Sequence, residues 1–370
     1  MNWSSRRVLI TGHTGFKGSW LSLWLQLKGA DLCGFGLEPP TAVNLFTDAG
    51  ISGGMLSVLG DIRDTAHVAK VFQEYRPEIV FHMAAQPLVR SSYWDPVGTY
   101  ATNVVGTASV LEAARQTRGV RAIVVVTTDK CYENREWDWP YRENDRLGGY
   151  DPYSNSKACT ELVVSSFRSS FFDPKTYDKH GVAIASARAG NVIGGGDWAT
   201  DRLVPDIMRA FLAGETVLIR NPHAIRPWQH VLEPLRGYIA VAESLYEKGP
   251  VDGEAWNFGP EQADAQTVEW MVGKLASLWG EEANWRVDSG DHPHEAHTLQ
   301  LDWSKAKRRL QWSPALTLSE ALAETTEWYK VKSKNTDMRA FTVKQIQSYE
   351  ERCRSCLDST SLSRGATPKK

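Results

Sequence analysis

The stretch VLITGHTGFKGSWLSLWLQLKG, residues 8–29, decides the fold. It opens with an apolar run typical of a buried strand and continues into Gly12, Gly15 and Gly18, which form a GxxGxxG pattern. Apolar residues at 20, 21, 24, 25 and 27 then recur at helical spacing. Glycines between a strand and a helix allow a tight turn and let backbone N–H groups approach a pyrophosphate at the positive end of the helix. The stretch therefore predicts a dinucleotide-binding turn.

Further apolar runs alternate with segments of helical spacing along the chain. They are LCGFG (32–36), MLSVL (55–59), IVFHMAA (79–85), AIVVVTT (122–128), VAIASA (182–187) and EAWNFGP (254–260). Near-continuous apolar strands separated by helices predict a parallel sheet with helices on both faces. We therefore expect an α/β fold with a doubly wound, Rossmann-like parallel sheet.

Charge and cysteine content narrow the function classes. The 370 residues carry 42 basic and 44 acidic side chains, a formal net charge of −2, so no overall field draws the chain to nucleic acid or to a membrane. The apolar run behind Arg6 and Arg7 stops at Ile10, which is too short for an export signal. Five scattered cysteines fit a reducing compartment. We expect a soluble, cytoplasmic protein without nucleic-acid or membrane partners.

The second strand favours NAD over NADP. Residues 31–43 contain no Lys or Arg to receive a 2′-phosphate, and Glu38 is the acid nearest to the place where a ribose contact is expected. Asp61, in GDIRD, is placed either to bind the adenine amino group or to cap a turn. The residues expected to bind NAD are Gly12, His13, Thr14, Gly15, Phe16, Lys17, Gly18, Asp61, Ile62, Ala84, Ala85, Tyr153 and Lys157.

Chemically active side chains follow the apolar run AIVVV (122–126), which continues into Thr128, Asp129 and Lys130. The ends of parallel strands are where such a sheet binds its ligands. Tyr153 and Lys157, in DPYSNSK, are four residues apart and share one face of a helix. A cation beside a phenol lowers the pKa of the phenol, and the phenolate can take the proton of an alcohol while NAD takes the hydride.

Several motifs together resemble the extended short-chain dehydrogenase/reductases that modify nucleotide sugars. They cover the chain from about residue 8 to about residue 330 and are TGHTGFKGSWL, GDIRD, HMAAQPLVRSSY, TNVVGT, VVVTTDKCYENREW, DPYSNSKACTEL, ARAGNVIGGGDW, RPWQHVLEPL and AWNFGP. The match is closest to the CDP-glucose 4,6-dehydratases of that family. The resemblance implies CDP-glucose as substrate, NAD as cofactor, and a product formed by C4 oxidation, loss of water across C5–C6 and return of the hydride to C6.

The resemblance also implies roles for the residues after the fifth strand. Tyr153 takes the 4-hydroxyl proton, Lys157 lowers its pKa and binds the nicotinamide ribose, and Thr128 hydrogen-bonds O4. Asp129 matches the general acid of related dehydratases. Lys130 departs from the TDP-glucose and GDP-mannose dehydratases, which carry Glu there as the base. Lys130 is either a neutral lysine acting as the base or a charged partner that positions Asp129.

The resemblance implies a substrate site in the second half of the chain. Asn191, Arg202, Arg226 and His294 match positions near the nucleotide diphosphate or the sugar nucleotide. We prefer this interpretation of DHPHEAH (291–297) to a metal site, because the proposed chemistry needs no metal. Residues 1–189 plus 226–260 are expected to bind NAD, and residues 190–225 plus 261–332 to form a smaller, interleaved nucleotide-sugar domain. Residues 333–370 are expected to be a polar tail with one helix at most, around 343–355.

Two other functions share parts of this pattern. A nucleotide-sugar 4-epimerase has the same glycine turn and tyrosine–lysine pair but does not need Asp129 and Lys130. A non-catalytic NAD-binding protein would have been free to lose these side chains. The helices expected at TNVVGTASVLEAARQ and YSNSKACTELVVSSF carry small and apolar residues, and in the family such helices pair subunits. A homodimer or homotetramer is therefore expected.

Overall fold

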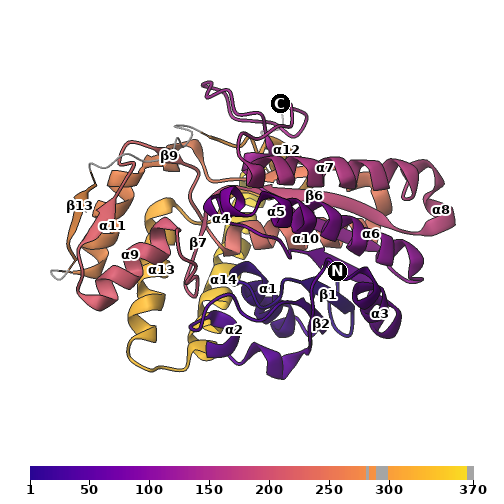
Figure 1. The fold of residues 1–370 in the computed structure, drawn as a ribbon, viewed down its shortest axis with the longest axis horizontal. Coiled ribbons are helices and arrows are strands. Elements are labelled where there is room, and N and C mark those ends of the chain that lie inside the picture. Colours follow the sequence, from indigo (N-terminus) through magenta and orange to yellow (C-terminus); the bar gives the residue numbers. More distant parts are fainter. Residues whose placement is uncertain (281–282, 289–298, 365–370) are drawn as a thin grey trace.

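A seven-stranded parallel sheet forms the centre of the computed structural model, which describes residues 1–280, 283–288 and 299–364 (Figure 1). The strand order is β11-β6-β5-β4-β1-β2-β3. The strands are β1 Arg7–Thr11, β2 Asp31–Gly36, β3 Leu56–Leu59, β4 Ile79–His82, β5 Ala122–Val126, β6 Ala183–Ala189 and β11 Ala255–Phe258. Each strand expected from the sequence is confirmed, and so is the doubly wound parallel sheet.

Two strands end earlier than their apolar runs. β4 ends at His82, where the Met83 N–H is shared between the Thr11 carbonyl, at 3.2 Å, and the Thr11 hydroxyl, at 3.1 Å, and the Ala84 N–H donates to the same hydroxyl at 3.2 Å. β5 stops at Val126, and a short 3₁₀ turn, η3 Asp129–Cys131, begins three residues later. One further backbone bond follows each strand, from Met83 to Thr11 and from Thr127 to Ala187, and beyond these residues side-chain hydroxyls accept the backbone N–H groups of Ala84 and Lys130.

Helices cover both faces of the sheet because alternate strand residues point to opposite sides. Val8 and Ile10 of β1 pack with α1 Phe16–Leu27 and α10 Leu232–Lys248, whereas Leu9 packs with α3 Thr65–Tyr75, α6 Gly106–Gln116 and α7 Pro152–Ser170. Two hydrophobic cores result, one on each face. No helix within the described residues has the length and apolar character needed to cross a membrane.

Smaller elements form the part of the molecule that carries α9, α11 and β13 in Figure 1. The short pairs are β7 with β10, β9 with β12, and β8 with β13.

The remaining strands and helices of the whole molecule are β7 Val192–Ile193, α9 Leu203–Ala213, β8 Val217–Ile219, β9 Ile225–Arg226, β10 Gln229–His230, β12 Gln266–Thr267, α11 Val268–Trp279, β13 Trp285–Val287, α12 Ser304–Leu310, α13 Leu318–Lys332, α2 Leu45–Asp48, α4 Val89–Trp94, α5 Pro96–Tyr100, α8 Tyr177–His180, and a π-helical turn η2 Ala101–Val105.

The last helix, α14 Met338–Arg364, is longer than the helix expected at 343–355. Met338, Ile346 and Tyr349 are buried, so its first half docks on the protein. The indole of Trp24, in α1, donates to Glu350 at 2.7 Å. Up to residue 355 the sequence of this helix is mostly polar because one stripe of it is buried, while many of the other positions are exposed.

Candidate active site

The shape of the turn between β1 and α1 requires residues without a Cβ atom. Gly12 has φ +74°, and a Cβ there would lie 2.8 Å from the Ala84 backbone. A Cβ on Gly18 would lie 2.1 Å from the Gly12 carbonyl oxygen. Gly15 is the N-cap of α1, and a Cβ on it would meet nothing nearer than 3.4 Å. Since glycine offers no side-chain acceptor, the first N–H groups of the helix are left for an anion. The turn fits a dinucleotide pyrophosphate.

Two residues expected to bind the cofactor turn their side chains into the protein. His13 is fully buried, and its Nε2 hydrogen-bonds Ser57 Oγ at 2.7 Å. Burial lowers the pKa of His13 to about 4, so the ring is neutral. The ring occupies the space that a side chain on Gly34 would need, because a Cβ there would lie 2.2 Å from it. The hydroxyl of Thr14 donates to the Leu37 carbonyl at 2.7 Å. Both side chains therefore fix the shape of the turn.

Lys17 lies between the turn and the catalytic end of the sheet. Its ammonium is 5.7 Å from the ring centre of Tyr238, in α10. Burial, with further repulsion from Lys157 and Arg202, lowers the pKa of Lys17 to about 7. Phe16 precedes Lys17 in the sequence. Its ring packs against Gly194, where a Cβ would lie 3.2 Å from the Phe16 ring.

The other expected cofactor residues follow β3 and β4. The carboxylate of Asp61 accepts from Arg63, which lowers the pKa of Asp61. Ile62 is buried against Gly106, where a Cβ would lie 2.6 Å from the isoleucine side chain. Ala84 forms one wall of the glycine turn and Ala85 follows it, half-buried. All lie at the carboxyl edge of the sheet.

The acid after β5 is deeply buried. The Thr128 hydroxyl donates to Asp129 Oδ1 at 2.9 Å, while Oδ2 has no hydrogen-bond partner among the described residues. Burial raises the pKa of Asp129, and the charges of Lys130 and Arg226 oppose the shift only partly. A carboxyl with a raised pKa, and with one oxygen that no described residue hydrogen-bonds, is suited to donating a proton.

Tyr153 and Lys157 lie on one face of α7, beside this acid. Lys157 donates to the Val126 carbonyl at 3.3 Å, and burial lowers its pKa to about 8, against the opposing effect of Glu161. The sequence predicts a lowered pKa for Tyr153. In the structure, burial instead raises the pKa of Tyr153 to about 12, because desolvation outweighs the neighbouring Thr128 hydroxyl and nearby positive charge.

The substrate residues expected from the sequence meet the same edge. Arg202 donates to the buried carboxylate of Asp197 at 2.8 Å, and its charge acts on Tyr153. The charge of Arg226 acts on Asp129. Asn191 follows β6, and its carbonyl accepts from the backbone N–H of residue 229 at 3.0 Å. His294 lies outside the described residues.

Positive charge dominates this edge. The basic side chains that act on the site are Lys17, Lys130, Lys157, Arg202 and Arg226. The acids that act on the same groups are Asp129, Asp151, Glu161 and Asp197. Basic side chains gathered at this edge suit the phosphates of a dinucleotide and a nucleotide sugar. No metal-binding group of His, Cys, Asp or Glu side chains occurs in the part of the chain that the structure describes.

Sequence reasoning missed three buried residues next to the site. Asp197 holds Arg202, and Glu161 pairs with Arg188 behind α7. The signal for Glu161 was present, because it follows Lys157 by one helical turn and so continues the Tyr153–Lys157 face. The partners come from β6 and from the loop after it, which spacing along one helix cannot indicate.

The glycine turn, the parallel sheet and the tyrosine–lysine pair define a dinucleotide-dependent enzyme of the Rossmann class. The chain belongs to the GDP-mannose 4,6 dehydratase family, whose model matches residues 9–325.

Known proteins resemble it over nearly the whole chain. The CDP-glucose 4,6-dehydratase of Salmonella typhimurium is 55% identical over 94% of this chain and 97% of its own length. The solved UDP-glucose 4-epimerase of Thermotoga maritima, with UDP-glucose, is 25% identical over 89% of this chain and 99% of that chain, with a TM-score of 0.74. MoeE5 in complex with UDP-glucose and NAD shares the fold at 24% identity and a TM-score of 0.74, covering 89% of this chain and 99% of that chain.

Proposed function

We propose that this chain is an NAD-dependent CDP-glucose 4,6-dehydratase, a hydro-lyase that forms CDP-4-keto-6-deoxy-D-glucose. The observation that carries the proposal is the 55% identity, over 94% of the chain, to an enzyme of that name. The site supports it, because a buried acid, a neighbouring base and a tyrosine–lysine pair lie together at the edge that carries the glycine turn.

The reaction requires these groups to act in sequence. The C5 hydrogen of a hexose is barely acidic, and the 6-hydroxyl is a poor leaving group. A ketone at C4 makes the C5 hydrogen acidic and places the 6-hydroxyl β to a carbonyl, so water can be eliminated. When bound, NAD supplies a hydride acceptor for C4 and later a hydride donor for C6.

The cofactor is held by the β1–α1 turn. Gly12 and Gly18 let the turn pack tightly against Ala84 and against the Gly12 carbonyl, so that its backbone can approach the pyrophosphate, and Lys157 is assigned to the nicotinamide ribose. Tyr153 accepts the proton of the 4-hydroxyl, and Thr128 orients O4. The pKa of about 12 for Tyr153 means that the phenol must be deprotonated with help from nearby cations.

Asp129 protonates the leaving 6-hydroxyl. Its raised pKa and its free Oδ2 support this role. Lys130 removes the C5 proton, and the alternative is that its charge only positions Asp129. A Lys130→Met variant separates the two roles. Loss of solvent deuterium at C5 with C4 oxidation retained supports the base, whereas unchanged deuterium incorporation supports positioning.

The two halves of the chain have separate tasks in this proposal. Residues 1–189 plus 226–260 bind NAD, and residues 190–225 plus 261–332 bind the nucleotide sugar. Arg202 and Arg226 hold the diphosphate, helped by Asn191. We also infer a cytoplasmic location, since NAD and nucleotide sugars are cytoplasmic metabolites.

We infer a homodimer or homotetramer that pairs through the helices around α7. Large apolar side chains are exposed on α4, α5, η2 and α7: Trp94, Val97, Val105 and Leu162 are 80%, 77%, 56% and 58% exposed. A second copy of the chain would bury them. Light scattering tests this, and a mass of 41.3 kDa at micromolar concentration contradicts it.

Product analysis tests the function. The protein is incubated with NAD and, separately, with CDP-, TDP-, UDP- and GDP-glucose, and each product mass is measured. Loss of one water from CDP-glucose alone supports the proposal. A galactose isomer without mass change indicates a 4-epimerase, the activity of the Thermotoga maritima relative. No change with any of the four indicates a binding protein.

A further inference from the structure

A buried ion pair lies behind the catalytic helix. Glu161 of α7 and Arg188 of β6 are 2.8 Å apart, and their side chains are 4% and 3% exposed. The carboxylate also accepts from Thr127 at 2.5 Å and from Ser186 at 2.6 Å. A buried charge is tolerated when it is paired and its oxygens are hydrogen-bonded, and this one is.

Glu161 connects two elements that carry catalytic side chains. It lies on the same face of α7 as Tyr153 and Lys157, one turn beyond the lysine. Its hydrogen-bond donor Thr127 is the residue directly before Thr128. One carboxylate therefore ties the helix to the start of the polar segment after β5.

Arg188 holds the other end of that segment. Its guanidinium donates to the Tyr132 hydroxyl at 2.7 Å and to the Glu143 carbonyl at 3.0 Å. The Tyr132 hydroxyl in turn donates to Asn257 at 2.7 Å. Asp129 and Lys130 thus lie between two anchors, Thr127 and Tyr132, that both contact the same ion pair.

We propose that Glu161 and Arg188 are positioning residues, which hold residues 127–132 against α7 and so set the acid–base pair relative to Tyr153 and Lys157. This inference rests on the proposed dehydratase function. Neither residue touches the reacting groups, so their effect on geometry runs through Asp129 and Lys130. A displacement of about 1 Å between reacting groups is enough to lower a rate about 100-fold.

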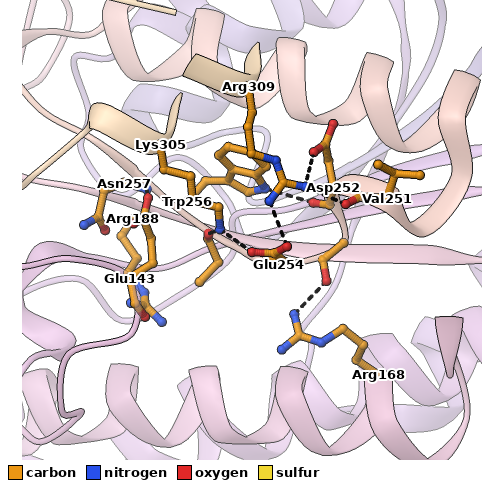
Figure 2. Close-up of polar contacts among 12 residues, drawn as sticks. Glu143, Arg168, Arg188, Val251, Asp252, Glu254, Trp256, Asn257, Lys305 and Arg309 are labelled. Atoms are coloured by element: carbon orange, nitrogen blue, oxygen red, sulfur yellow. Dashed lines mark hydrogen bonds and ion pairs between the residues drawn. The ribbon is translucent and has the colours of Figure 1, made fainter. Parts of the chain in front are cut away.

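The ion pair borders a pocket. A pocket of about 460 Å³ is lined by Glu161, Arg188, Arg168 and Lys305. Figure 2 shows Arg188 on one side of this region, next to Glu143, and Arg168 on another, where it donates to the Gly253 carbonyl at 2.9 Å. A small ion can therefore enter the space left by a truncated side chain.

Charge gives a second readout. The groups that act on Lys157 are Glu161 on its own helix, Cys131 of η3, Lys17 of α1 and His82 of β4. Glu161 and, to a smaller extent, Cys131 raise the pKa of Lys157. Without the charge of Glu161, Lys157 loses its proton at lower pH. The alkaline decline of the rate should then move to lower pH in a Glu161→Gln variant.

Four variants test the proposal with CDP-glucose and NAD. Glu161→Gln and Arg188→Ala should lower kcat for water loss about 100-fold, with the KM for CDP-glucose within about threefold of wild type. Low millimolar guanidinium should restore at least about tenfold in Arg188→Ala and change nothing in wild type. Arg168→Ala is the matched control, because it lines the same pocket on α7 but does not contact residues 127–132. Glu161→Asp should recover part of the rate lost in Glu161→Gln.

Hydrogen exchange distinguishes failure of this inference from failure of the proposed function. Amides of residues 127–132 should exchange faster in Glu161→Gln than in Arg168→Ala, whether or not the chain turns over CDP-glucose. If the wild-type protein turns over CDP-glucose, and the folded variants match it in both rate and hydrogen exchange, the positioning role is overturned. Wild-type inactivity with faster exchange in Glu161→Gln leaves the positioning role standing and overturns the proposed function alone.

Discussion

The cofactor turn and the catalytic edge lie side by side but are built on different physical principles. The turn depends on space: Gly18 has room for a hydrogen but not for a methyl group, which would lie 2.1 Å from the Gly12 carbonyl. The catalytic edge depends on ionisable side chains that are shielded from water, since burial raises the pKa of Asp129 and lowers that of Lys157, against the effect of neighbouring charges. Substitutions that add bulk should therefore abolish cofactor binding at the turn. Substitutions that keep the shape of a side chain but remove its charge or its ionisable proton should abolish catalysis at the edge.

The largest effect should follow the loss of one oxygen at the catalytic edge. Tyr153→Phe should reduce kcat about 10³-fold, because it removes the group that accepts the 4-hydroxyl proton. Tyr238→Phe is the control, since its hydroxyl is buried without a hydrogen-bond partner among the described residues. Rates measured by the mass change of CDP-glucose should fall only in the first variant. Equal rates would remove Tyr153 from the chemistry.

Alanine substitutions should have different effects at two glycines of the turn. Gly18→Ala forces the turn open and should lower the free energy of unfolding by about 3 kcal/mol, with NAD binding lost. Gly15→Ala has no backbone contact nearer than 3.4 Å and should change stability far less. Denaturant unfolding and NAD titration measure both. A Gly18→Ala protein of wild-type stability contradicts the steric account.

Buried histidines should make the molecule sensitive to acid. His82 lies between the hydroxyls of Thr11 and Thr107, at 2.7 and 2.9 Å, and burial lowers its pKa from 6.5 to about 3. Between these values the unfolded chain binds a proton that the folded chain does not. Stability is therefore present above pH 6.5 and is lost as the pH falls, at about 1.4 kcal/mol per pH unit for one proton.

A His82→Gln variant isolates this contribution. Its unfolding free energy should fall less steeply than that of wild type between pH 6 and pH 5, by about 1.4 kcal/mol per unit. His13 and His230, with pKa values lowered by burial to about 4 and about 3, account for further dependence. Urea unfolding at each pH gives the slopes. Identical slopes would mean that His82 is protonated in the folded state.

The smallest effect should come from the exposed rim of the cofactor site. Asp61→Asn should weaken NAD binding only a few-fold, because the ion pair with Arg63 is partly exposed and such pairs contribute about 1 kcal/mol or less. Arg63→Gln leaves the carboxylate in place and serves as control. Calorimetric titration with NAD compares them. A loss as large as that of Gly18→Ala would make charge, not space, decisive at the turn.

The sequence predicts well what local pattern controls. Continuous apolar runs identify the seven strands, and the spacing of Tyr153 and Lys157 places them on one helix face. His13 was expected at the cofactor, yet its ring is drawn into the space beside Gly34. That outcome depends on β2 packing against the turn, which a motif does not encode.

Other features depend on distant parts of the chain. Glu161 and Arg188 are 27 positions apart, and no spacing rule links a helix face to the next strand. The raised pKa of Asp129 follows from depth of burial, which appears only once the sheet and its covering segments are assembled. The type of reaction is thus easier to predict from the sequence than the buried contacts that position the catalytic residues and shift their pKa values.

The docking of α14 has a consequence for synthesis of the protein. Trp24 belongs to the helix that begins at the cofactor turn, yet its indole donates to Glu350, 326 positions later. Lys28 of the same region also pairs with Glu350, at 2.7 Å. A ribosome must therefore translate past residue 350 before α14 can cover the back of α1. Nascent chains expose an apolar helix surface until then, which makes the interval before residue 350 emerges the one of greatest need for a chaperone.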